Sequence, residues 1–296
     1  MKKDKRIKDL SSLGQVLGNK QEEMKEPKKD LNVTTRNGDI PNLGWLFYKE
    51  YYKGLTKGLI NPQNEEGQIA FFNNKNKKIL EAQFSNYKNV FSSIKGGIAI
   101  KMKTIYPGLI MGIGVTHETG LKGEMILRLS FDYTTGLPYI PGSSIKGILR
   151  SVFPNSFSKA DKEFKESRTA YIRDIIGNQE LNVEELEAEL FEGKGAESIY
   201  DRDVFMDALI TDVPGNNFFL GSDYITPHGD NPLKSPNPIQ FLKILPEVTI
   251  TFHFRLNKGI ITVEQKKQLF EQILKDIGVG AKTNVGYGQL KSIANA

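Results

Sequence analysis

The chain has 296 residues, of which 39% are hydrophobic and 25% charged, and its formal net charge is +5. It has no cysteine and only three widely spaced histidines, which excludes disulfides and cysteine zinc sites and gives no reason to expect a metal or another cofactor. No apolar run is long enough to span a membrane and no secretory signal follows the lysine-rich start, so we expect a cytoplasmic protein that does not contact a membrane.

The charge is unevenly distributed along the sequence. Residues 159–197 hold six basic and eleven acidic residues, whereas residues 75–103 hold seven lysines and one glutamate. A basic body with an acidic segment suits a protein that binds a polyanion and also contacts protein partners. The alternative is that these charges only solvate the surface.

The start of the chain differs in character from the rest. Residues 1–40 are polar, dense in charge and poor in aromatic residues, so we expect a flexible basic tail there. Residues 41–296 are expected to form a single domain. It opens with an aromatic helical segment at residues 43–55, and a second helix is predicted at residues 79–91, where apolar residues recur at helical spacing.

Three segments alternate between apolar and polar residues: 98–106, 125–133 and 248–256. Each is predicted to be a strand with one buried face. The opposite faces carry basic and hydroxyl side chains such as Lys101 and Thr251, and a face of this kind can hold a nucleic acid or simply face solvent.

Two helices are marked by their caps. The first is predicted to begin at Ser143 or Ser144, because serine is a good N-cap residue. The last has a capping box formed by Thr262 and Gln265, and it is predicted to end at Gly278.

Between these helices, residues 155–200 are predicted to be an acidic helical insertion. Strands are predicted at 203–212, 218–226 and 239–245, with a proline-rich loop at 227–238. Strands that feed helices and return indicate an α+β fold, and we expect a ferredoxin-like (RRM-like) core with insertions.

The segment from Gly136 to Arg150 has the features of an anion site. Two prolines stiffen a loop, Gly142 allows close backbone approach, and a helix then opens with free N–H groups. The predicted phosphate-binding residues are Gly142, Ser143, Ser144, Lys146 and Arg150. The segment lacks the Lys-Ser/Thr pair of a P-loop, so we expect no NTPase, and the alternative is a capped helix after a proline turn.

A glycine-rich segment, residues 278–288, follows the last helix. Its glycines allow a tight backbone path, and its polar residues suit phosphate or ribose. Tyr287 could stack on a base or belong to the core. The predicted RNA-binding residues of this segment are Gly280, Lys282, Thr283, Asn284, Gly286 and Tyr287.

Together the two segments resemble those of one family. Pro-Tyr-Ile-Pro-Gly-Ser-Ser-Ile-Lys-Gly-x-Leu-Arg, followed later by Gly-x-Gly-Ala-Lys-Thr-x-x-Gly-Tyr-Gly, is similar to the RAMP superfamily of CRISPR-associated proteins. Within it the chain resembles the sixth subunit of the Cmr (type III-B) effector complex. Supporting pieces occur in the expected order between the two segments, at Asp203–Ala208, Asp223–His228 and Pro238–Ile244.

The resemblance implies a RAMP core whose C-terminal glycine-rich loop lies near RNA. It implies a non-catalytic structural subunit in an antiviral ribonucleoprotein, bound to guide RNA near the guide 3′ end and adjoining the duplex with target RNA. Its protein partners would be other Cmr subunits, especially the backbone subunit and the first subunit. His117 and His228 are further candidate RNA contacts.

Two other functions stay open. One is a metal-independent endoribonuclease, for which His117, His228 and Tyr133 are the candidate acid–base residues. The other is a protein-interaction subunit that uses the acidic insertion and the aromatic segment and has no direct RNA contact. Asp201, Asp203 and Asp207 suggest a divalent metal but are better read as structural.

Overall fold

The computed structural model describes residues 42–84, 95–111, 119–126, 129–156, 161–195, 198–226 and 238–293. These residues belong to one compact unit. The predicted tail at residues 1–40, the loop at 227–237, His117 and His228 lie outside the described residues. In the described part of the chain, no helix is long and apolar enough to cross a membrane.

The core is an antiparallel sheet, with the strand order β2-β4-β7-β1-β8 and with β3 paired to β7. The central pair runs from Gly97 opposite Arg255 to Lys103 opposite Thr249. Its strands are β1 (Gly97–Thr104), β2 (Tyr139–Ile140), β3 (Val204–Phe205), β4 (Ala208–Asp212), β7 (Thr249–Arg255) and β8 (Leu290–Ser292). The strands predicted near residues 98–106, 203–212 and 248–256 are thereby confirmed.

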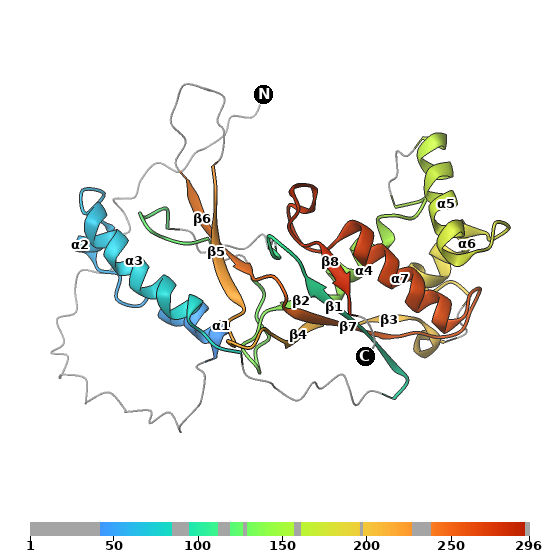
Figure 1. Cartoon of the computed structure of the whole chain (residues 1–296), viewed down its shortest axis with the longest axis horizontal. Helices are drawn as coiled ribbons and strands as arrows, with labels where there is room; N and C mark the ends of the chain where they lie inside the picture. Colours follow the sequence, from blue (N-terminus) through green and yellow to red (C-terminus); the bar gives the residue numbers. More distant parts are fainter. Residues whose placement is uncertain are drawn as a thin grey trace, which may run out of the picture. The chain divides into compact units, whose positions relative to one another are not determined.

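A separate two-stranded hairpin lies between β4 and β7 in the sequence. It pairs β5 (Leu220–Ile225) with β6 (Ile239–Ile244) along six consecutive residue pairs (Figure 1). The Leu109 amide donates a 2.9 Å hydrogen bond to Ile244 O, which ties the hairpin to the segment after β1. These are the two strands predicted in this part of the sequence.

Two helices belong to the core, α4 (Gly142–Arg150) and α7 (Val263–Ile277). Phe270 of α7 lies with its ring centroid 5.4 Å from that of Phe254 in β7, so α7 covers the face of the sheet that carries Phe254. The predicted capping box of α7 is present, and the helix ends at Gly278 as expected.

The acidic segment is helical, as predicted. It contains α5 (Lys162–Ile176), α6 (Val183–Glu187) and a π-helix, η3 (Ala188–Glu192). Tyr171 of α5 donates a 2.8 Å hydrogen bond to Asp276 of α7, so the segment is attached to the helical side of the core (Figure 1).

The first described helices are α1 (Leu43–Trp45), the π-helix η1 (Leu46–Glu50), α2 (Lys57–Ile60) and α3 (Glu65–Leu80). The helix predicted at residues 79–91 does not extend over residues 81–84, because α3 ends at Leu80 and Phe84 N donates a hydrogen bond to Asn217 O. A contact with a distant part of the chain overrides the local helical spacing there. Residues 85–91 lie outside the described residues.

Two predictions about strands are also wrong. The described residues of 125–133 form only single bridges, Ile126 with Phe241 and Phe131 with Pro138. The polar face predicted for residues 248–256 is not open to solvent, because Thr251 and His253 are 2% and 4% exposed. The hydroxyl of Thr251 has a partner within the protein, because its Oγ1 lies 2.6 Å from Thr211 Oγ1 of β4.

Candidate nucleic-acid interface

The glycine-rich loop, residues 278–288, joins α7 to β8 and is fastened by backbone hydrogen bonds. Val279 N donates to Gly288 O (2.9 Å) and Gly288 N donates to Gly108 O (2.8 Å). Ala281 N donates to Ile110 O (2.7 Å), so the loop is fixed against the segment that follows β1. A loop held in this way presents its tip in one conformation.

Gly288 shows why the loop requires glycine. Its φ is +72°, and a Cβ built on it would lie 1.8 Å from Val279 O. Any side chain would therefore break the Val279–Gly288 closure as well as being strained in the left-handed region. The spacing of glycines in this segment reflects the path of the backbone.

The tip of the loop is exposed. Lys282 and Asn284 are exposed, Thr283 is half-buried, and Thr283–Val285 form a single 3-10 turn. Lys282 has a φ of +59°, which turns the chain at the start of the tip. Within the described residues, no carboxylate lies at ion-pair distance from its ammonium, so its charge remains available to an anion.

Tyr287 is attached to the hairpin. Its hydroxyl donates a 2.8 Å hydrogen bond to Asp223 Oδ2, which also lies 2.8 Å from the ammonium of Lys243, and its ring packs edge-on against Phe241. Burial, and then the bond to Asp223, raise the pKa of Tyr287 to about 12. Of the two roles predicted for Tyr287, the contacts favour the one inside the protein.

The beginning of α4 differs from its prediction. The helix begins at Gly142 with Pro141 as N-cap, and neither Ser143 nor Ser144 caps it. The Gly142 amide instead donates a 2.7 Å hydrogen bond to Asp207 Oδ1, and a Cβ on Gly142 would lie 2.3 Å from Phe205 O. The close approach that Gly142 allows is therefore used by the protein's own backbone, and a carboxylate already lies at this helix start.

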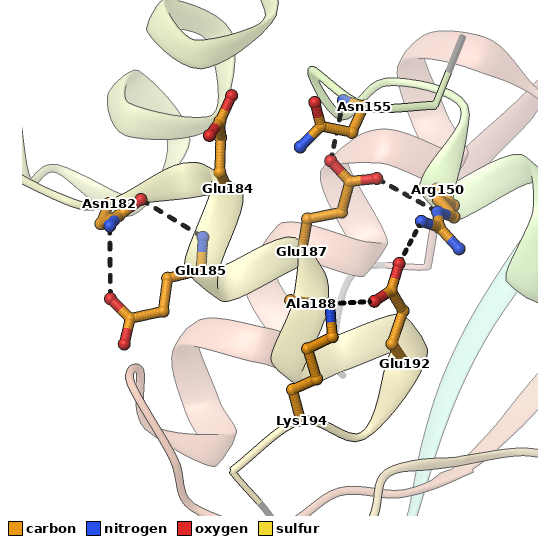
Figure 2. A pocket seen from close by; sticks show the side chains of 9 residues that line it. All are labelled: Arg150, Asn155, Asn182, Glu184, Glu185, Glu187, Ala188, Glu192 and Lys194. Carbon is orange, nitrogen blue, oxygen red and sulfur yellow. Dashed lines mark hydrogen bonds and ion pairs between the residues drawn. The ribbon is translucent and has the colours of Figure 1, made fainter. Parts of the chain in front are cut away.

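The two basic residues of α4 have partners within the protein. The ammonium of Lys146 lies 5.7 Å from the centroid of the Phe205 ring. Arg150 bonds Glu187 through Nε (3.1 Å) and Glu192 through Nη2 (2.8 Å), as Figure 2 shows. Arg150 thus joins α4 to the acidic segment, and the charge of its guanidinium is balanced there.

The two predicted segments are anchored to different parts of the core. The glycine-rich loop is bonded to Gly108, Ile110 and the hairpin, whereas the start of α4 is bonded to Asp207 between β3 and β4. The acidic residues of that region are structural, as expected, since Asp203 Oδ2 lies 2.7 Å from the buried ammonium of Lys266. In the residues that the structure describes, no group of three or more His, Asp or Glu could hold a metal ion.

Sequence reasoning missed Asp207 and Asp223 as the residues that fix the two segments. The sequence indicates Asp207 only as part of a motif that supports the family resemblance and as a structural or metal-binding carboxylate, and Asp223 only as part of such a motif. Their partners lie 65 and 64 residues away in the sequence, at Gly142 and Tyr287, so no local pattern could have revealed the pairing.

The chain is similar to known proteins in its sequence and in its fold. A protein-family model described as the RAMP superfamily matches residues 101–291. The CRISPR system CMR subunit Cmr6 of Saccharolobus solfataricus is 30% identical over 211 residues, which is 69% of this chain but only 61% of that relative's length. The Cmr6 subunit of Pyrococcus furiosus is 27% identical over 299 residues, covering 85% of this chain and 82% of that protein.

A solved structure supports the fold. A chain in a cryo-EM structure of the Type III-B Cmr-beta bound to cognate target RNA superposes with a TM-score of 0.54, at 23% identity, and the match covers 84% of each chain.

Proposed function

Because the chain belongs to the RAMP superfamily and is homologous to Cmr6, we propose that it is a non-catalytic, guide-RNA-binding subunit of a type III-B CRISPR ribonucleoprotein that acts in the cytoplasm. Its partners would be guide RNA near the 3′ end, the duplex of guide with target RNA, and other Cmr subunits, above all the backbone subunit and the first subunit. Base pairing between the RNAs would supply the sequence specificity.

The proposal includes a ferredoxin-like core. The elements β1, α4, β4, β7, α7 and β8 follow the order β-α-β-β-α-β along the chain, and the four strands lie in the order β8-β1-β7-β4. This order places the glycine-rich loop directly between the second helix and the last strand of the core.

One observation carries the RNA-binding proposal: a fixed loop inside the family match presents an exposed lysine and asparagine at its tip. Lys282 would meet a phosphate, and Asn284 with Thr283 would meet phosphate or ribose oxygens. Contacts of this kind bind the RNA backbone without reading its sequence. Gly280 and Gly286 would act by shaping the loop.

The other predicted residues contribute less directly to the proposal. Ser143 and Ser144 are exposed in the first turn of α4. Their hydroxyls would donate hydrogen bonds to a phosphate that lies beside this turn. Lys146 and Arg150 would chiefly hold their helix in place, because Phe205, Glu187 and Glu192 already engage them.

The test is co-purification of the tagged full-length protein from its native host at several salt concentrations. We expect short guide RNAs and RAMP partners to be recovered, and Lys282→Asn to reduce RNA recovery. Asparagine tolerates a positive φ, so this change removes the charge and keeps the turn. Lys258→Asn, at an exposed lysine of another loop, is the matched control.

For the isolated protein, the slope of log K against log salt should fall by about one for Lys282→Asn. Recovery of RAMP partners without RNA, or equal effects of Lys282→Asn and Lys258→Asn, would contradict RNA binding by the loop. The protein-interaction function would then be the better account.

A further inference from the structure

A second surface, away from the glycine-rich loop, has aromatic side chains open to solvent. A cavity of about 530 Å³ lies between the first helices and the turn that precedes β2. Trp45 and Tyr133 on its walls are 49% and 97% exposed, which is unusual for rings of this size. Its lining comprises Asn42, Gly44, Trp45, Tyr48, Lys49, Phe131, Asp132 and Tyr133; we call it the aromatic pocket.

The floor of the aromatic pocket is rigid. The Phe131 ring lies 4.7 Å from that of Phe47 and 6.0 Å from that of Tyr48, centroid to centroid. A Cβ on Gly44 would lie 3.1 Å from Phe131 Cβ, so the helix passes close to this ring. The floor is therefore already packed and would not need to rearrange for a ligand.

The side chain of Asn42 connects the two exposed walls. Its Oδ1 accepts a hydrogen bond from Trp45 N (3.0 Å), and its Nδ2 donates one to Tyr133 O (3.3 Å). The turn that carries Tyr133 is closed by Asp132 Oδ1, which accepts hydrogen bonds from the amide (2.7 Å) and the hydroxyl (2.8 Å) of Thr135. These bonds fix the backbone at Trp45 and at Tyr133, so both exposed rings lie at one cavity.

The lining of the aromatic pocket has one cationic side chain, Lys49, and one carboxylate, Asp132. Lys49 is exposed. The ammonium of Lys75 bonds the backbone oxygen of Glu50, the residue after Lys49. Burial lowers the pKa of Lys75, the carboxylate of Glu50 opposes this change, and the charges of Lys78 and Lys53 lower the pKa further.

We propose that the aromatic pocket receives one unstacked base of single-stranded RNA, between Trp45 and Tyr133, while Lys49 meets an adjacent phosphate. Any base offers a flat face to such rings, so the contact would be tolerant of sequence, as backbone binding at the glycine-rich loop also is. Lys49 favours a polyanion over an apolar protein side chain as occupant, because the carboxylate of Asp132 in the lining already accepts two hydrogen bonds from Thr135. This inference rests on the proposed RNA-binding function.

Trp45 is the only tryptophan of the chain, so its fluorescence reports on the aromatic pocket alone. The full-length protein would be titrated with a short single-stranded RNA and with an abasic oligonucleotide of the same length. We expect the RNA to quench Trp45 and the abasic strand to bind without quenching. Tyr133→Ala should weaken RNA binding about ten-fold, the size of one stacked base.

Tyr200→Ala, at a tyrosine 74% exposed elsewhere, is the matched control and should leave binding unchanged. If RNA binds without quenching Trp45 and Tyr133→Ala has no effect, while Lys282→Asn still weakens binding, the aromatic pocket does not hold a base and the proposed function stands. If no RNA binds at low salt, both fail. Loss of a co-purifying RAMP subunit on Tyr133→Ala, with RNA affinity unchanged, would assign the pocket to a protein and overturn the proposal.

Discussion

At the scale of single residues, neighbouring carboxylates determine which basic side chains are available to bind an anion. Arg150 lies in a motif that suggests phosphate binding, yet Glu187 and Glu192 engage its guanidinium. Lys282 has no such neighbour among the described residues. Two cations that look alike in the sequence therefore have different roles, one holding an element in place and the other free for an anion.

We predict that Glu187→Ala destabilises the protein strongly. The Glu187 side chain is 2% exposed and accepts hydrogen bonds from Arg150 Nε and from Asn155 N (2.9 Å). Its removal leaves a half-buried guanidinium and a backbone amide short of a partner, at a cost of about 2 kcal/mol. The measurement is the free energy of unfolding in urea. Glu192→Ala removes the exposed partner of the same arginine, and an equal loss there would contradict the prediction.

At the scale of elements, local patterns predict an element well when its neighbours agree with them. The capping box of α7 and the alternation in β1 depend on residues a few positions apart, and both are found as expected. Residues 81–84 and the described residues of 125–133 lie in helical and strand patterns, but contacts with Asn217, Phe241 and Pro138 determine their conformation. Such long-range contacts cannot be seen from spacing.

The N-termini of α7 and α4 are capped differently, and alanine substitutions can test this difference. Thr262→Ala should lower the free energy of unfolding by about 1 kcal/mol, because Thr262 accepts a hydrogen bond from Gln265 N. Ser143→Ala should change it little, since Asp207 rather than Ser143 satisfies the start of α4. Equal losses in chemical denaturation would mean that Ser143 does cap its helix.

At the scale of the whole molecule, the hairpin, the loop and the sheet are joined by charged contacts at their margins. Asp223 binds Lys243 and Tyr287, and Glu247 bonds Lys291 and lies 3.7 Å from Lys103. Hydrogen bonds from Lys243 to Asp223 and from Lys291 to Glu247 lower the pKa of each carboxyl. The α+β fold and the main strands were predictable from the sequence, whereas these joins were not.

We predict a loss of stability in acid that has two parts. Burial lowers the pKa of His253 below 6.5, so its contribution is present above that pH and declines as the pH falls through the lowered value. The contributions of Asp223 and Glu247 are present above their ordinary values of 3.8 and 4.5 and are lost at lower pH. Urea midpoints measured against pH should show both declines.

Asp223→Asn should flatten the lower decline and leave the upper one in place. An unchanged profile would show that the carboxylate of Asp223 does not support the fold.

The position of the hairpin in the chain affects how its length can vary among related proteins. β4 ends at Asp212 and β7 begins at Thr249, and these two residues are cross-strand partners in the sheet. The 36 residues between them therefore leave and re-enter the sheet at a single point. Because loop closure depends only weakly on length, the length of this excursion can change while the register of the core strands stays the same, as long as its buried residues, such as Leu220 and Ile244, and its Asp223 contact are kept.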